Sequence, residues 1–315
     1  MTAGSCSTDG SHRPRGAAAR ASIATVAFLA LTSVACAQDA PGRLSADAAI
    51  GGYGLLRTDL DNGGDFEIGS VFARGSLGTA FNAQWSGELM LRYSYEDWNF
   101  SSPNALGPVG PWGAIQSPGV GFSLRYAHSE NLVAFIGPQL DWNYESGAST
   151  ADAQTYGATF GVTSVISPTL MLGIGGGVFR QINRTRFLPF VLVNWQIDDK
   201  WRLANPLQAG PTGGPGIELA YKISEQWEAA GGAAFRDERF RLRRDGPTPN
   251  GIGVEKGVPL FVRLTWAPSP KGKVDMYAGA VVGGELRVLD ASGSTVSSSD
   301  FKTAPLLGIT ASLEF

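Results

Sequence analysis

The chain has 315 residues, with 25 lysines and arginines against 28 aspartates and glutamates, and only two cysteines. A slightly acidic chain offers no basic surface for nucleic acid, so we do not expect nucleic acid among its partners. Both cysteines lie before residue 38, so a chain shortened there has neither a disulfide framework nor a thiolate metal site.

The first predicted element is a secretory signal peptide over residues 1–37. Three arginines precede the apolar run 23–34, and a small-x-small cleavage sequence ends at Ala37. This run is shorter than the roughly 20 residues that a membrane-spanning helix needs. We therefore predict an exported mature chain, residues 38–315, cleaved near Ala37. Acylation of Cys36 is the alternative, but a serine stands where a lipoprotein signal carries a leucine-like residue.

Segments of alternating apolar and polar residues follow from residue 44 onward, which is typical of strands with one apolar face. The clearest are 85–96, 132–145, 156–166, 258–266 and 274–288. Short connections begin near residues 78, 128, 167, 198, 224 and 269, and longer Gly-, Pro- and Ser-rich connections lie between them. The alternation of short and long connections predicts that all tight turns lie at one end of the sheet.

Tryptophans and tyrosines lie beside both kinds of connection, which is typical of the two interfaces of a membrane. A soluble sandwich would bury its tryptophans in mid-strand. Because hydrocarbon leaves the backbone of an edge strand unsatisfied, a sheet in the membrane must close. We predict an all-β fold, a single closed antiparallel transmembrane β-barrel of about 14 strands with short periplasmic turns and long external loops. The segment 201–208 is short and contains Pro206, so 12 strands is the alternative.

The last predicted strand ends on Phe315, with Leu313 two residues earlier and Gly308 upstream. This ending resembles the C-terminal signal by which the barrel assembly machinery recognises Gram-negative outer-membrane β-barrel proteins, although an aromatic residue is often found where Leu313 stands. Residues 198–232 are also similar to a porin-like barrel family of unknown function. The resemblance implies a location in the cell outer membrane, in contact with lipid and lipopolysaccharide, and it implies no substrate.

Catalytic and metal motifs are weak. His128 is the one histidine of residues 38–315, and it is followed directly by Ser129 and Glu130, which cannot converge with it as a triad. The segment 59–65, "DLDNGGD", departs from the calcium-loop pattern, and its Asn-Gly-Gly favours a hairpin turn. We therefore predict that the chain is not an enzyme and uses no metal or cofactor.

Charged residues fall on the predicted inward faces, with both signs in comparable numbers. They are Glu88, Arg92, Glu96, Arg125, Asp141, Glu145, Glu218, Lys222, Arg263, Asp275, Glu285 and Arg287. Such charges either line a water-filled channel and set its selectivity, or form ion pairs that fill a closed interior. About eight strands pack solid, so 14 strands favour a hydrated lumen. The predicted function is a passive or weakly selective channel for small solutes. The alternative is a non-conducting structural or interaction barrel that acts through its external loops.

The sequences of two external segments predict further roles. The long loop 98–117 is predicted to constrict the mouth. In the run 236–246 the strand parity slips after Phe235, which predicts a bulge near Asp237 and a strand that rises above the membrane. Its basic side chains either contact anionic substrates or lipopolysaccharide phosphates, or form a solvated hairpin tip. They are Arg239, Arg241, Arg243 and Arg244.

Overall fold

The computed structural model describes residues 42–206 and 208–315. The predicted signal peptide and its cleavage site near Ala37 lie outside the described residues. Within them, no helix is long and apolar enough to cross a membrane. The first strands are β1 (Leu44–Asp59), β2 (Asp65–Ala80), β3 (Trp85–Ser101), β4 (Ile115–Ser129), β5 (Leu132–Trp142), β6 (Tyr144–Glu145), β7 (Gln154–Ser167), β8 (Leu170–Gln181) and β9 (Arg184–Gln196). The others are β10 (Trp201–Ala204), β11 (Gly216–Lys222), β12 (Trp227–Ala234), β13 (Arg236–Arg241), β14 (Ile252–Ser269), β15 (Gly272–Leu289), β16 (Thr295–Phe301) and β17 (Ala304–Glu314), and the 3-10 helices are η1 (Asn104–Leu106) and η2 (Thr150–Asp152).

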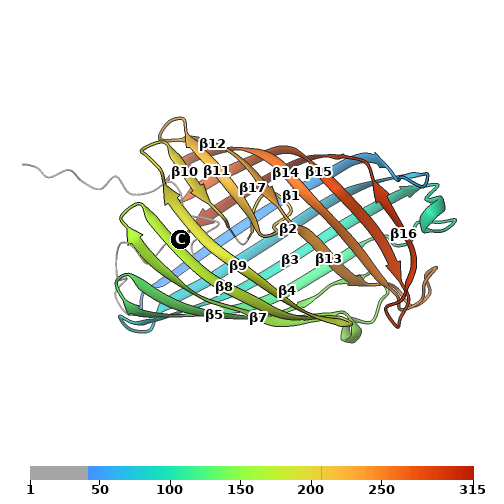
Figure 1. Ribbon diagram of the computed structural model, residues 1–315, viewed down its shortest axis with the longest axis horizontal. Coiled ribbons are helices and arrows are strands. Elements are labelled where there is room, and N and C mark those ends of the chain that lie inside the picture. Colours follow the sequence, from blue (N-terminus) through green and yellow to red (C-terminus); the bar gives the residue numbers. More distant parts are fainter. Residues whose placement is uncertain (1–41, 207) are drawn as a thin grey trace, which may run out of the picture.

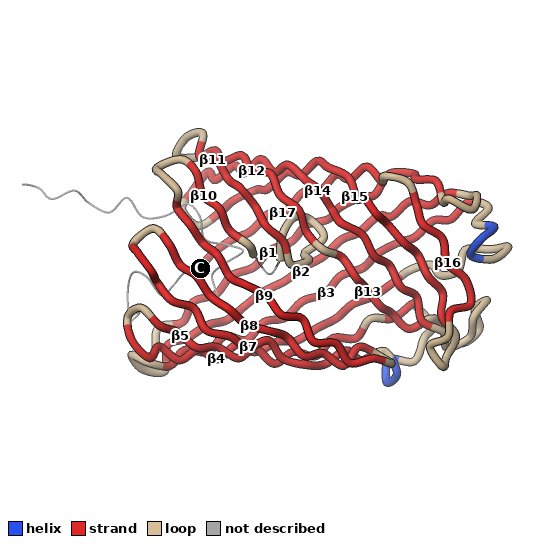
Figure 2. The backbone as a smooth tube through the Cα atoms, viewed as in Figure 1, coloured by secondary structure: helices blue, strands red, loops and turns tan. Residues whose placement is uncertain are grey.

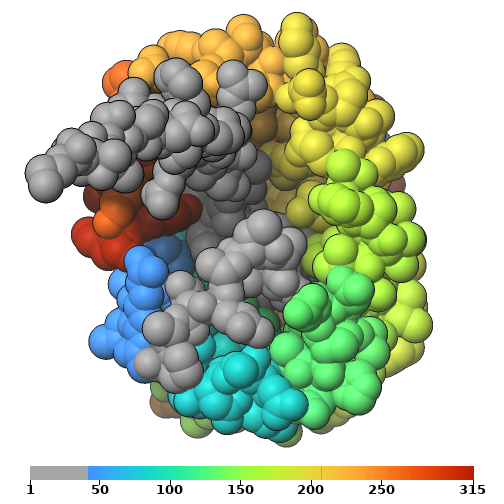
Figure 3. All heavy atoms as spheres, turned by 90° about the vertical axis from the view of Figure 1, so that its left-hand side faces the viewer, coloured from blue at the N-terminus to red at the C-terminus, as the bar shows by residue number. Residues whose placement is uncertain are grey.

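Fourteen strands form one closed antiparallel ring (Figure 1). The ring runs β1-β2-β3-β4-β5-β7-β8-β9-β10-β11-β12-β14-β15-β17, and β17 closes it on β1 from Asp47↔Glu314 to Leu55↔Leu306. Figure 3 looks at one end of the ring and shows strands of successive colours around its rim. The prediction of 14 strands is confirmed, because even the short β10 pairs with both β9 and β11.

The six predicted short connections join β2–β3, β4–β5, β7–β8, β9–β10, β11–β12 and β14–β15. They lie at the left-hand end of Figure 1, together with the C-terminus, and the longer connections other than β10–β11 lie at the other end. Large apolar side chains stand exposed on the outer face, including Ile50, Leu91, Ile174, Val262 and Ile309. An exposed apolar band on a closed sheet is the surface that a hydrocarbon layer requires. We refer to the end with the short turns as the periplasmic end and to the other as the outer end.

A narrower ring closes the outer end (Figure 2). Here β6 continues β5, β13 continues β12, and β16 pairs with the upper part of β15. The edge of β13 meets β6 at Arg241↔Tyr144, and the end of β16 meets the β1–β2 turn through the bridge Leu60↔Phe301. The narrow ring thus consists of β1, β2, β3, β4, β6, β13, β14, β15 and β16, while β7 to β9 lie outside it and β10 and β11 end nearer the periplasmic end.

The narrow ring is filled by an apolar core. Phe66 stacks on Trp98 with ring centroids 5.7 Å apart, and Trp98, Trp112 and Phe240 continue the contact at 5.5 and 5.0 Å. Leucine, isoleucine and valine side chains from β1, β2, β4 and β15 complete the cluster. A ring of about eight strands is narrow enough for side chains to fill. The outer end is therefore packed solid along the barrel axis, and Trp112 shows that part of the loop 98–117 contributes to this closure.

A bulge in β15 decides which of its residues join this core. Gly283 has a φ of 59°, and the pairing of β14 with β15 shifts register between Lys256 and Val258. The extra residue reverses the inward and outward faces beyond it, so Leu286 and Val288 lie in the core. The predicted inward positions of Glu285 and Arg287 are consequently wrong, because these side chains lie on the opposite face of β15.

The bulge predicted near Asp237 is also wrong. β12 and β13 keep one register with β14, from Ala233↔Leu260 to Arg236↔Gly257. The parity therefore does not slip, and Phe240 points into the apolar core. The apparent break in the pattern reflects a change in what the inward face contacts, from water and ion pairs below to apolar side chains above.

Candidate functional site

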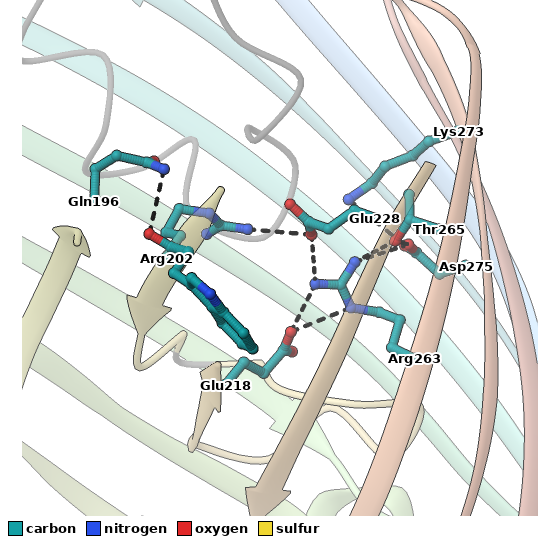
Figure 4. A network of polar contacts seen from close by, with 9 residues as sticks. Gln196, Arg202, Glu218, Glu228, Arg263, Thr265, Lys273 and Asp275 are labelled. Carbon is teal, nitrogen blue, oxygen red and sulfur yellow. Dashed lines mark hydrogen bonds and ion pairs between the residues drawn. The ribbon is translucent and has the colours of Figure 1, made fainter. Parts of the chain in front are cut away.

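We call the 14-strand ring below the narrow ring the wide ring. One ion-pair network lies inside it, toward the periplasmic end (Figure 4). The guanidinium of Arg263 on β14 lies 2.8 Å from Glu218, 3.0 Å from Glu228 and 3.3 Å from Asp275. Arg202 on β10 adds a contact to Glu228 at 3.4 Å. The network joins side chains from five strands, so it fixes the interior charges and ties the short β10 to the rest of the wall.

Two further pairs lie on the facing part of the wall. Arg92 on β3 donates to Asp141 on β5 at 2.8 Å, and Arg125 on β4 contacts Glu88 at 2.7 Å. These positions alternate with exposed apolar neighbours, which places them on the inner face. These four charges on the inner face are therefore held in opposite-sign contacts.

A third group lies directly beneath the apolar core. Arg236 donates to Glu255 at 2.8 Å and to Glu96 at 2.7 Å, and Tyr53 donates to Glu96 at 2.6 Å. Glu255 is only 1% exposed. Sequence reasoning included Glu96 but missed Arg236 and Glu255. Extending the β12 alternation through Phe235 would have placed Arg236 on the inner face.

The other predicted lining residues lie elsewhere. Glu145 is buried in the narrow ring, where it accepts hydrogen bonds from the backbone N–H groups of Gly113 at 3.0 Å and Arg243 at 2.9 Å. Lys222 lies at the periplasmic end and contacts Glu225 of the adjacent turn at 2.9 Å. The predicted lining set is thus divided between the wide interior, the outer end, a turn, and the outward face of β15.

The connection between β10 and β11 folds into the interior. Gln208 accepts a hydrogen bond from Arg74 on β2. A Cβ on Gly210 would lie 2.7 Å from the ring of Phe261, and a Cβ on Gly308 of β17 would lie 2.8 Å from the Cβ of Pro211. The connection therefore reaches strands on the far side of the ring and narrows the passage. The sequence "GGPG" at 213–216 indicated a bend there but not its direction.

Above β10 and β11 the ladder of backbone hydrogen bonds is interrupted, and we call this part of the wall the side window. Among the described residues, β10 pairs with β9 only from Asn194 to Gln196, and Asn205 extends this contact to Val193. Figure 1 shows β10 and β11 confined to the periplasmic end. Side chains span the side window: Arg184 and Arg186 of β9 contact Asp237 of β13, the first at 3.1 Å. The side window is therefore bridged by ion pairs and not by backbone hydrogen bonds.

The β8–β9 turn rests on the outside of the narrow ring. Ile182 packs against Ile252, Val254 and Leu289, and Asn183 accepts a hydrogen bond from Arg239 at 2.7 Å. This contact holds the tip of the β8–β9 hairpin beside β13. The hairpin thus frames the upper edge of the side window.

The predicted anion-binding arginines do not form one cluster. Arg239 lies at the side window, whereas Arg241 donates to the backbone oxygens of Asp152 at 3.0 Å and Asn250 at 2.7 Å. Arg243 lies 3.8 Å from Glu145, and Arg244 is exposed in the loop after β13. Of these four arginines, Arg239 is the one that lies beside the basic side chains of Arg184 and Arg186.

The two segments considered for catalysis and calcium have local roles. His128 is the penultimate residue of β4, and its ring centroid lies 6.3 Å from that of Tyr126. Gly63 and Gly64 have φ values of 95° and 88°, as a tight β1–β2 turn requires. Residues 42–206 and 208–315 contain no group of three or more His, Cys, Asp or Glu side chains placed to hold a metal ion.

Comparison with known proteins rests on structure. No protein-family model and no curated protein matches the sequence. The TodX monoaromatic hydrocarbon channel of P. putida, in its deltaS2 mutant, aligns with a TM-score of 0.50 and 10% identity over 88% of this chain and 91% of that one. An outer-membrane channel from Pseudomonas putida F1 aligns with a TM-score of 0.47 and 8% identity over 89% and 97%. The chain has the fold of the outer-membrane channel barrels. At these identities the similarity concerns the fold alone.

Proposed function

We propose that the chain is a passive, narrow channel for small solutes in the outer membrane of a Gram-negative bacterium. The observation that carries the proposal is the wide 14-strand ring, whose inner face is lined by charged side chains. A ring of this size encloses more space than its side chains fill. The structural similarity to proteins named as channels, and not as enzymes, supports the same conclusion.

The route through the barrel is bent in this proposal. The apolar core blocks the axis at the outer end, so solutes enter through the side window between β9 and β13. They then pass the inward β10–β11 connection and leave at the periplasmic end. Small solutes pass along this path slowly, because side chains narrow it at each constriction.

Planar-bilayer recording of refolded residues 38–315 tests the proposal. We expect small, steady conductance steps from protein whose folded state is verified by its heat-dependent gel mobility. Arg263→Gln removes the centre of the interior network and should change the size of the steps. Silence from correctly folded protein, at all voltages and salt concentrations, would contradict a channel function.

A second candidate function is a non-conducting barrel that acts through its external surface. The packed outer ring favours it, because a solid apolar core blocks the axis at the mouth and holds the outer end rigid. The same recording separates the two functions, since a platform stays silent while its folded state is intact.

The C-terminal strand supports assembly in this proposal. Leu313 and Phe315 are 53% and 70% exposed on the outer face of β17, where a membrane-embedded recognition partner has access to them. We propose that these residues and Gly308 form the signal for the barrel assembly machinery.

A further inference from the structure

Basic side chains gather at the side window from three parts of the chain. Arg239 and Arg287 each pair in register with Val254, so they lie on one face of neighbouring strands β13, β14 and β15. Arg184 and Arg186 reach the same region from β9, as their shared contact with Asp237 shows. Four guanidinium groups thus gather at the side window.

Carboxylates neutralise only part of this cluster. Asp237 serves both Arg184 and Arg186, and Glu285 serves Arg287 at 3.0 Å. Lys256 also contacts Glu285, at 3.5 Å, so the second carboxylate is shared as well. The neighbouring Asp300 lies opposite Glu285 on β16 and is exposed. Five cations therefore lie near three carboxylates at the side window.

Arg239 is the member that forms no ion pair with a carboxylate among the described residues. Its side chain is only 7% exposed, and its one hydrogen bond within the described chain runs from Nη1 to the neutral amide of Asn183. Its Nε is buried and has no hydrogen-bond partner among the described residues. An unsatisfied buried donor on a charged group is costly, so this site favours a ligand that accepts hydrogen bonds.

The electrostatic environment of Arg239 also favours an anion. Arg239 is buried, and the positive charge of Arg184 lies beside it. An added anion would offset both effects, because it supplies a counter-charge and an acceptor. A guanidinium fork presents two parallel donors, which matches the two oxygens of a carboxylate or phosphate group.

We propose that the side window is an oxyanion-binding site, in which Arg239, Arg184 and Arg186 hold a carboxylate or phosphate group. The role of this site in transport rests on the proposed channel function. In that role, the site makes small organic or inorganic anions the preferred solutes. The same chemistry also fits the phosphate of a lipopolysaccharide at the outer surface. The experiments below separate the soluble anion from the lipid.

Binding is measured first, without reference to conduction. Inorganic phosphate is titrated by calorimetry into detergent-solubilised protein that has been refolded without lipopolysaccharide. We expect saturable binding that Arg239→Gln weakens about tenfold, because one charge-assisted contact is lost. Arg57→Gln is the matched control, since Arg57 is an exposed arginine at the outer end of β1. Equal binding by the wild type, Arg239→Gln and Arg57→Gln proteins would overturn the site, provided that all three show heat-dependent gel mobility.

Ion selectivity in planar bilayers then tests the role in transport. We expect chloride to permeate better than potassium through the wild-type protein, and Arg239→Gln or Arg186→Gln to lower this preference. Phosphate binding in a silent protein would support the site and contradict the channel. Conduction without phosphate binding would overturn the site and leave the channel intact. Binding to lipopolysaccharide vesicles that depends on Arg239, without a change in selectivity, would assign the site to the lipid and overturn its transport role.

Discussion

At the scale of single residues, Arg236 shows how this barrel places charge in its interior. The residue bridges Glu255 and Glu96 directly beneath the apolar core, where little water is available to solvate any of the three groups. A buried ion pair adds little stability in itself, but removing one member leaves the other charges uncompensated. The main effect of Arg236 is therefore to keep the charges of Glu255 and Glu96 compensated, and the ion pairs themselves add little stability.

The first prediction concerns this residue. Arg236→Ala should lower the free energy of unfolding by about 3–5 kcal/mol, because two buried carboxylates lose their cation. Urea unfolding in lipid vesicles, followed by tryptophan fluorescence, measures the change. Arg202→Ala is a suitable comparison, since its 3.4 Å contact with Glu228 should be worth much less. A loss below that of Arg202→Ala would show that Glu255 and Glu96 are not charged in the folded protein.

The second prediction concerns packing in the narrow ring. A Cβ on Gly284 would overlap the ring of Phe301, so Gly284→Ala forces the aromatic ring to move. We expect a loss of about 1–3 kcal/mol from overpacking. The double variant Gly284→Ala with Phe301→Leu should recover part of the loss in the same unfolding assay. Additive losses in the double variant would argue against this contact.

The third prediction is a pH dependence in the β15–β16 turn. The Asp290 carboxylate accepts hydrogen bonds from the hydroxyl of Ser292 at 2.6 Å and from the backbone N–H groups of Ser292 and Ser294 at 2.9 Å, and these bonds lower its pKa from the usual 3.8. A lowered pKa stabilises the turn above pH 3.8, and this stabilisation is lost as the pH falls through the lower value. NMR should show the Ser292 and Ser294 amide signals shifting in strong acid. Asp290→Asn should abolish that titration, and identical shifts in both proteins would contradict the assignment.

At the scale of elements, the lower barrel was predictable from the sequence and the outer end was not. Alternation within a strand and the residues of a tight turn are local signals, which is why the six short connections and the strand count were predicted correctly. The contact of β13 with β6 and that of β16 with the β1–β2 turn join segments far apart in the chain. No local pattern marks such partners.

The same limit explains the mistaken positions in β15. Alternation counted from Val274 predicts that Glu285 and Arg287 point inward, and one positive-φ glycine, Gly283, reverses them. The sequence "GG" at 283–284 is typical of a β-bulge. Whether a bulge reverses the two faces of β15 depends on the apolar side chains that Leu286 contacts, and these come from distant strands. The candidate window site was likewise hidden, because Arg184, Arg239 and Arg287 come from separate strands.

The fourth prediction belongs to the C-terminal strand. Phe315→Ala should reduce the amount of assembled barrel in cells, because the residue is exposed at the end of the closing strand and available for recognition. The heat-dependent gel shift of outer-membrane fractions measures assembly. Phe81→Ala, an exposed aromatic at another periplasmic turn, is the control. An equal yield of Phe315→Ala and Phe81→Ala barrels would contradict a signalling role.

At the scale of the whole molecule, a wide lower ring carries a narrow and packed outer ring. The change in width is possible because β10 and β11 end early and β7 to β9 pass outside the contact of β13 with β6. The passage therefore depends on the side window and on the inward β10–β11 connection. In a barrel of constant width these two features would not exist.

The fifth prediction follows from this arrangement. Replacing residues 209–213 by a shorter Gly-Ser link should increase the conductance of the barrel, because Pro211 no longer reaches Gly308 across the interior. Shortening the exposed β15–β16 turn at 291–293 should leave the conductance unchanged. Equal conductance of both variants would show that the β10–β11 connection does not narrow the passage.

The narrow outer ring also has a consequence for the order of folding. Its closure requires Arg241 to meet Tyr144 and Phe301 to meet the strand end at Leu60, so segments from both halves of the chain must be present first. Contacts between distant segments form late, because the chain must first lose the entropy of long loops. An unfinished barrel therefore has a straight and open axis that the finished protein lacks. Leakage through this protein should be greatest while it is being made, and the last contacts to form are the ones that seal the membrane.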